Sequence, residues 1–180
     1  MKQTKTMFTK LLLALTLVLP LSAEAVDISW SGFGTAGYTI SDQPYKYQRF
    51  IDDHGTFKRD SILGGQVDLK FDQQWGATIQ GRLSTAPDSD SKIEPSLAWA
   101  FLSWRPTDDL LLRAGKLRVP FMLNTENQEV GVTYPYARLP VEVYATAPTT
   151  DVYGAMFSKT WFTPSFEWSL DGYFGKLGYF

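Results

Sequence analysis

The stretch LGGQVDLKFDQQWGATIQGRL (residues 63–83) decides the fold, because apolar residues alternate with small or polar ones on both sides of a short break. Alternation with a period of two is typical of β-strands. The break at 72–74 has the length of a tight antiparallel hairpin turn. If Phe71 lies opposite Trp75, one register places the apolar residues of both strands on one face of the hairpin and the small or polar residues on the other face. This separation fixes the register. It predicts the pairs Leu69–Ala77, Val67–Ile79 and Leu63–Leu83 on the apolar face, and Lys70–Gly76, Asp68–Thr78 and Gln66–Gln80 on the polar face.

Five further segments show strand patterns of varying clarity, which makes seven expected strands in all. Residues 28–40 and 166–174 alternate well, and 151–161 alternates except at Lys159. The segments 97–104 and 110–118 are blurred. In 110–118, Arg113 has one parity whereas Lys116 and Arg118 have the other. Every proline after residue 25 falls outside these segments, as a ladder that uses each N–H requires.

The first 25 residues read as a signal peptide. Lysines precede an apolar run at 11–21, and the run ends in Ala23-Glu24-Ala25, an A-x-A cleavage pattern. A transmembrane helix needs about 20 apolar residues, so this run is too short for one. We therefore expect cleavage after Ala25 and export from the cytoplasm.

The connections between the expected strands alternate strictly in length. Those at 41–62, 84–96 and 119–150 are long, whereas those at 72–74, 105–109 and 162–165 are short. Transmembrane β-barrels have this asymmetry, with short periplasmic turns, longer extracellular loops and aromatic girdles. Aromatic residues do gather beside the short turns, and we expect a lipid-facing girdle of Phe71, Trp75, Trp104, Trp161 and Phe166.

The barrel interpretation also assigns the two faces of the 63–83 hairpin. Its apolar residues, Val67, Leu69, Ala77 and Ile79, are expected to face lipid. Its polar residues are expected to face the lumen: Gln66, Asp68, Lys70, Thr78 and Gln80. A soluble secreted β-sandwich is the alternative, because it also gives short alternating strands.

Composition excludes several kinds of chemistry. The chain has 180 residues, 17 Lys+Arg against 19 Asp+Glu, no Cys and one His. It therefore has no thiol, disulfide or multi-histidine metal site, and no basic surface for nucleic acid. His54 lies in a loop beside Asp52 and Asp53, and 88–90 is a polar loop, so we expect no metal or cofactor at either place. We expect no enzyme, since a barrel-embedded lipase would need a histidine on a strand.

Three stretches resemble the N-terminal part of porin-like outer-membrane proteins of Gram-negative bacteria. They are WAFLSWRPTDD (99–109), LRAGKLRVP (112–120) and VTYPYARLPVEVY (132–144). The opening WSGFGTAG (30–37) and the segment 60–71 fit the same family. The resemblance implies an outer-membrane barrel of about 16 strands, often a homotrimer, that lets small hydrophilic solutes or ions diffuse passively. A non-conducting structural or adhesion barrel stays open as an alternative function.

The resemblance also implies a role for segment 119–150, because the corresponding porin loop folds inward and narrows the lumen. Opposed charges across such a constriction would filter solutes by charge. The candidate pore-lining residues are Arg82, Arg113, Lys116, Arg118, Glu126, Glu129, Arg138 and Glu142.

Seven strands are an odd number, whereas bacterial single-chain barrels have even numbers. We therefore expect a truncated barrel, in which residues 26–180 form a curved antiparallel sheet with a gap instead of a sealed cylinder.

Overall fold

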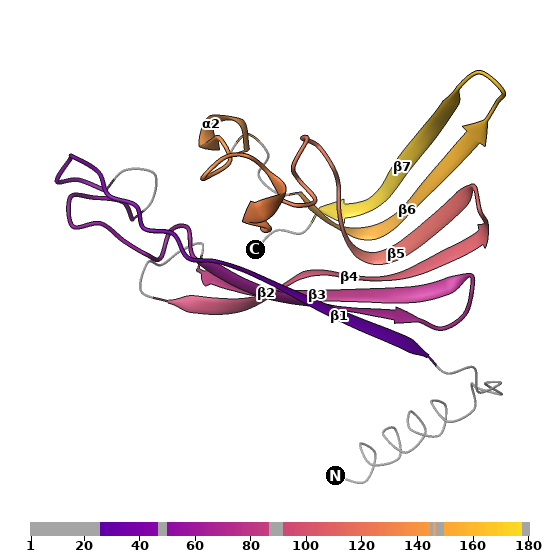
Figure 1. The fold of residues 1–180 in the computed structure, drawn as a ribbon, viewed down its shortest axis with the longest axis horizontal. Helices are drawn as coiled ribbons and strands as arrows, with labels where there is room; N and C mark the ends of the chain where they lie inside the picture. Colours follow the sequence, from indigo (N-terminus) through magenta and orange to yellow (C-terminus); the bar gives the residue numbers. More distant parts are fainter. Residues whose placement is uncertain (1–25, 47–49, 87–91, 145, 147–149, 178–180) are drawn as a thin grey trace, which may run out of the picture.

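All seven strands belong to one antiparallel sheet in the computed structural model, which describes residues 26–46, 50–86, 92–144, 146 and 150–177. Each strand pairs with its neighbours in sequence (Figure 1). The strands are β1 (Asp27–Thr35), β2 (Ile62–Lys70), β3 (Trp75–Thr85), β4 (Ile93–Thr107), β5 (Leu110–Arg118), β6 (Asp151–Phe162) and β7 (Glu167–Leu177). The expected signal peptide lies outside the described residues, and so does the 88–90 loop.

The predicted register of the 63–83 hairpin is confirmed pair by pair. Val67 lies opposite Ile79, Gln66 opposite Gln80, and the other four expected pairs are also present. The turn closes with a hydrogen bond from the Phe71 N–H to the Trp75 carbonyl (3.0 Å). The separation of apolar and polar residues onto opposite faces was therefore enough to determine the strand register.

β1 is shorter than expected and β4 is longer. β1 ends at Thr35 because the chain beyond it packs irregularly against 50–61. Thr39 forms an isolated bridge with Thr56, and the Gly37 N–H binds the Ser61 hydroxyl. β4 includes Pro95 and Pro106, so the expectation that all prolines avoid strands was wrong.

The two prolines sit where β4 does not need its full ladder. β4 pairs with β5 only from Ala100 onward, so Pro95 precedes that pairing. Pro106 lies where the register shifts between Trp104 and Thr107. Free edges and bulges are the places where a strand tolerates proline. The longer β3 and β4 reduce the connection expected at 84–96 to residues 86–92.

The sheet is open and strongly curved, with β5, β6 and β7 rising away from the plane of β1 to β4 (Figure 1). Among the described residues, β1 and β7 each pair with one neighbour only. This confirms the expected curved sheet with a gap. The described residues do not form a two-sheet sandwich, because one sheet contains all seven of their strands.

Glycines pair across the bend. Gly115 of β5 lies opposite Gly154 of β6, which lies opposite Gly175 of β7. The φ of Gly115 is +143°, and a Cβ there would lie 2.2 Å from the carbonyl oxygen of Ala100. Only glycine permits this conformation and close approach.

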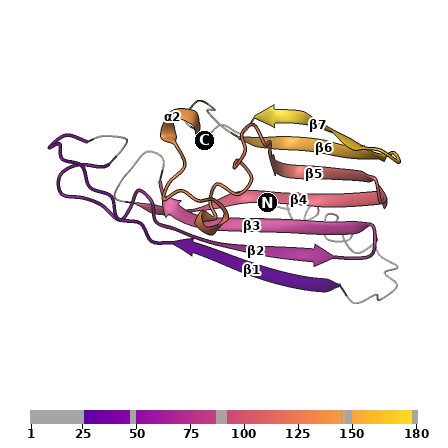
Figure 2. The ribbon, with the colours of Figure 1, turned by 45° about the horizontal axis from the view of Figure 1, so that its top comes forward.

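The described part of segment 119–150 (residues 119–144, 146 and 150) lies inside the curve of the sheet (Figures 1 and 2). It contains a short 3-10 helix (Gly131–Thr133) and the single-turn helix α2 (Val141–Tyr144). Thr125 of this segment is fully buried, and its hydroxyl accepts a hydrogen bond from the Met122 N–H (2.9 Å) within the segment. Within the described residues, no helix combines the length and apolarity needed to cross a bilayer.

The opposite face of the sheet is apolar and exposed. Its large side chains include Trp30 (84 % exposed), Ile79 (49 %) and Phe174 (85 %). Aromatic pairs form at the short turns, where Trp75 stacks on Trp104 and Trp161 on Trp168, with ring centroids 5.4 and 4.3 Å apart. Contiguous exposed apolar surface of this kind marks an interaction with another protein or with a membrane.

Candidate functional site

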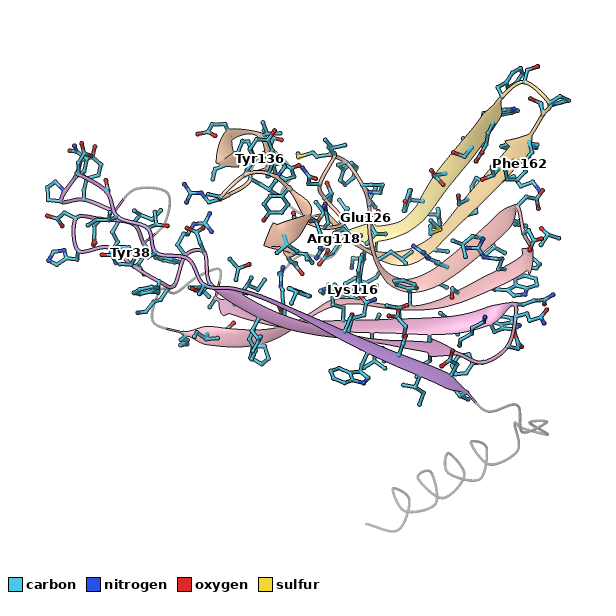
Figure 3. All side chains as sticks on the ribbon, in the orientation of Figure 1. Tyr38, Lys116, Arg118, Glu126, Tyr136 and Phe162 are labelled. Atoms are coloured by element: carbon cyan, nitrogen blue, oxygen red, sulfur yellow. The ribbon has the colours of Figure 1, made fainter. Side chains whose placement is uncertain are left out.

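Five charged side chains form a connected group on the inner face of the sheet, and one of them, Glu129, comes from segment 119–150. Glu129 of the segment binds Arg82 of β3 and Arg118 of β5, the latter at 2.9 Å between Oε1 and Nη2. Asp151, the first residue of β6, binds Lys116 (Oδ2 to Nζ, 3.1 Å) and Arg118 (Oδ1 to Nε, 3.5 Å). We call Arg82, Lys116, Arg118, Glu129 and Asp151 the charge cluster (Figure 3 labels Lys116 and Arg118).

Four members of the charge cluster are buried. Arg118 is 1 % exposed in its side chain, and Lys116, Glu129 and Asp151 are also largely covered, whereas Arg82 keeps 24 % of its side chain exposed. Buried charges are costly to desolvate and persist when opposite charges and hydrogen bonds surround them. The Lys116 ammonium also donates to the Leu97 carbonyl (2.5 Å), and the Arg118 guanidinium lies over the Trp99 ring (5.6 Å).

The curvature of β5 explains how its cations reach one face. Arg113 and Arg118 are five residues apart, so a regular strand would place them on opposite faces. Both nevertheless contact aromatic rings of the inner face, Arg113 over Phe101 (4.8 Å) and Arg118 over Trp99. Gly115 lies between them with its positive φ. The irregular backbone at Gly115 therefore accounts for the mixed parity of this strand.

A hydrogen-bonded polar ladder continues the inner face along β2 and β3. Thr78 donates to Asp68 (2.7 Å), Gln66 donates to Asp68 (2.8 Å), and Gln80 donates to Gln66 (2.9 Å). The Trp99 indole N–H also donates to Gln66 (3.2 Å). Four of the residues expected to face the lumen are thus linked to one another, whereas Lys70 is exposed at the end of β2.

A hollow of about 990 Å³ lies between the sheet and segment 119–150. Three members of the charge cluster, Arg82, Lys116 and Glu129, line it. Four tyrosines also contribute to the lining, namely Tyr134, Tyr136, Tyr144 and Tyr153. Burial, and then the negative charge of Asp60, raises the pKa of Tyr134, so its hydroxyl is a neutral donor, here to the Gln128 carbonyl (3.2 Å).

The structure brings together only part of the predicted constriction. Arg82, Lys116, Arg118 and Glu129 meet in the charge cluster. Arg113 lies further along β5, opposite Met156, and Arg138 pairs with Asp60 (3.7 Å). Glu126 and Glu142 are exposed and make no ion pair with another described residue.

Sequence reasoning missed Asp151, Asp60 and Trp99 as site residues. Asp151 could have been found, because an acidic residue at the start of β6 falls opposite Arg118 once the β5–β6 register is drawn. Asp60 and Trp99 reach their partners only through tertiary packing. Trp168, which stacks on Trp161, was likewise missing from the predicted aromatic girdle.

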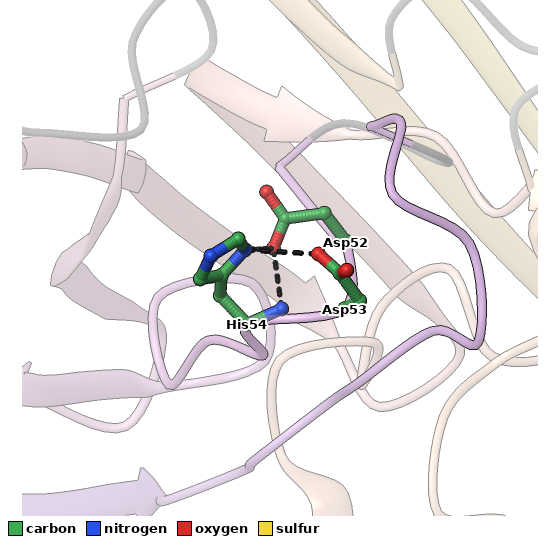
Figure 4. A group of neighbouring side chains, drawn as sticks. All are labelled: Asp52, Asp53 and His54. Atoms are coloured by element: carbon green, nitrogen blue, oxygen red, sulfur yellow. Dashed lines mark hydrogen bonds and ion pairs between the residues drawn. The ribbon is translucent and has the colours of Figure 1, made fainter.

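His54 lies in the exposed loop where it was expected. Its Nδ1 is 2.9 Å from Asp53 Oδ1 and 3.7 Å from Asp52 Oδ1 (Figure 4). Its side chain is 87 % exposed. A cluster of exposed carboxylates around one histidine is common on protein surfaces, and we assign it no function.

No protein-family model, curated protein or solved structure matches the chain.

Proposed function

We propose that this protein is a porin-like channel of the Gram-negative outer membrane, which lets small hydrophilic solutes or ions diffuse passively. The observation that carries the proposal is the position of segment 119–150. This segment lies on the polar concave face of a curved antiparallel sheet and is tied by Glu129 to two strands of the wall, β3 and β5. A loop held there would narrow a lumen.

The two faces of the sheet support the membrane part of the proposal. The concave face carries the polar ladder and the charge cluster, and the convex face carries exposed apolar side chains with stacked tryptophans near the turns. Outer-membrane barrels have a polar interior, an apolar outer band and aromatic girdles. In hydrocarbon the edges of β1 and β7 have to pair with further strands, of the same chain or of another copy, because unpaired backbone groups are costly there.

Cysteine labelling tests the orientation of the wall. The chain has no cysteine, so single Ile79→Cys and Thr78→Cys variants can be compared directly in intact outer membranes. If Ile79 faces lipid and Thr78 faces water, a hydrophilic maleimide labels only the Thr78 variant. In a water-soluble sheet the Ile79 variant would label at least as fast, because Ile79 is 49 % exposed. That order would overturn the proposal.

Conductance separates a channel from a structural or adhesion barrel, the second candidate function. The protein extracted in mild detergent from the outer membrane that naturally contains it is expected to give discrete conductance steps in planar bilayers. An outer-membrane location without conductance would favour the structural barrel.

A further inference from the structure

We propose that this channel prefers small anions and that the exposed guanidinium of Arg82 is the group they meet at the constriction. The inference rests on the proposed channel function. It follows from the charge balance of the hollow and from the way in which the ions of the charge cluster are buried.

The charge cluster has an excess of positive charge. It combines three cations, Arg82, Lys116 and Arg118, with two carboxylates, Glu129 and Asp151, although the whole chain has a formal net charge of −2. The residues that line the hollow show the same balance. Their cations are Arg59, Arg82, Lys116 and Arg138, against the anions Asp60, Glu94 and Glu129. A low-dielectric wall strengthens the field of such an excess inside a narrow passage.

The carboxylates of the charge cluster are turned toward its own cations. Glu129 and Asp151 are 6 % and 8 % exposed, so these two carboxylates present little negative surface to a passing cation. Asp60 of the hollow is paired with Arg138. Glu94 is exposed but lies at the start of β4, opposite Ser84, and is not part of the charge cluster.

Arg82 differs from the other cations of the charge cluster. Its Nε donates to the Ser96 hydroxyl (2.9 Å), and its Nη1 binds Glu129. These contacts leave Nη2 without an acceptor among the described residues, and the side chain is the most exposed of the five. A guanidinium fixed on one side with donors open on the other suits an anion, since charge-assisted hydrogen bonds to arginine are strong.

The test is the zero-current potential of the extracted channel in planar bilayers under a tenfold KCl gradient. The wild type is expected to pass chloride in preference to potassium. Arg82→Gln is expected to lower the chloride-to-potassium permeability ratio about fivefold, which corresponds to about 1 kcal/mol for one unit charge at close range in water. Arg82→Lys keeps the charge and is expected to retain most of the preference.

Glu129→Gln is the matched control for loop movement. Arg82→Gln and Glu129→Gln break the same ion pair and remove opposite charges. Charge-based selectivity predicts opposite shifts in the permeability ratio, whereas release of segment 119–150 would shift both in the same direction. Arg105→Gln, at an exposed position before the β4–β5 turn, is expected to leave the ratio unchanged.

The outcomes distinguish this inference from the function on which it rests. A channel that prefers potassium, an unchanged ratio in Arg82→Gln, or shifts of one sign in both pair-breaking variants would overturn the inference and leave the channel standing. The absence of any conductance would overturn the channel itself, and the anion preference with it.

Discussion

Ile79 and Thr78 are neighbours on β3 that point to opposite faces, so they offer a test at the scale of one residue. If the convex face contacts hydrocarbon, Ile79→Arg is expected to destabilise the protein by about 2–4 kcal/mol when position 79 lies near the bilayer midplane. Thr78→Arg is expected to cost much less, because Asp68, which binds Thr78 now, can pair with the new cation. Urea unfolding in lipid vesicles, followed by tryptophan fluorescence, measures both, and equal penalties would contradict the two-faced wall.

Gly115 offers a second residue-scale test, because its backbone admits no side chain. Gly115→Ala is expected to destabilise the protein by roughly 1–3 kcal/mol through backbone strain at a positive φ, in addition to the clash with the Ala100 carbonyl. Gly81→Ala is the control, since the nearest atom to a Cβ there is 3.9 Å away. Unfolding midpoints of the two variants in detergent are compared. A tolerated Gly115→Ala would show that the bend of β5 does not depend on glycine.

At the scale of elements, the regular parts of the sheet were predictable and the irregular parts were not. The β2–β3 hairpin has pure faces on both strands, so alternation alone fixed its register. β5 was predicted with its correct bounds, but the faces of Arg113, Lys116 and Arg118 stayed unassigned. These three side chains reach the same face because of the backbone conformation at Gly115. The alternation of residue types along a strand gives no sign of a positive φ.

The contacts of segment 119–150 in the candidate site could likewise be predicted only in part from local sequence patterns. Sequence singled out Glu129 and the cations of β3 and β5, but their meeting is a long-range event: Glu129 is 47 residues from Arg82 in the chain. Asp151 completes the charge cluster from the first residue of a strand. Local sequence patterns therefore predicted most of the charged residues of the charge cluster. Which of them form ion pairs depends on how the loop folds onto the sheet.

Deletion within this segment tests its role as an element. Removal of residues 124–136 takes out Glu129 and buried Thr125, so the remaining loop loses its ties to β3 and β5. If the segment narrows a lumen, single-channel conductance in planar bilayers is expected to rise. Unchanged conductance, with the variant still present in the outer membrane, would reduce the segment to an external loop.

At the scale of the whole molecule, the two edge strands of the sheet, β1 and β7, determine whether the seven strands can span a membrane by themselves. β1 and β7 both run in the same direction in this antiparallel order, so joining them would create a parallel seam, which is atypical of bacterial single-chain barrels. Left open, each edge presents unpaired N–H and C=O groups, and each such group costs several kcal/mol in hydrocarbon. Exposed edges of this kind invite association with other chains.

We therefore expect that the isolated polypeptide 26–180, refolded into detergent and added to planar bilayers, gives no discrete conductance steps. Erratic leaks or aggregates are the expected result, because the sheet formed by the described residues leaves the outer edges of β1 and β7 without a partner strand. If the proposed function holds, the protein extracted from the native outer membrane is the positive control in the same bilayers. Reproducible unitary steps from the purified polypeptide would show that its strands can close, either through a parallel β1–β7 seam or by edge pairing between copies. Crosslinking between β1 and β7 would then distinguish the two, since a single-chain seam gives an intramolecular product and edge pairing gives a dimer.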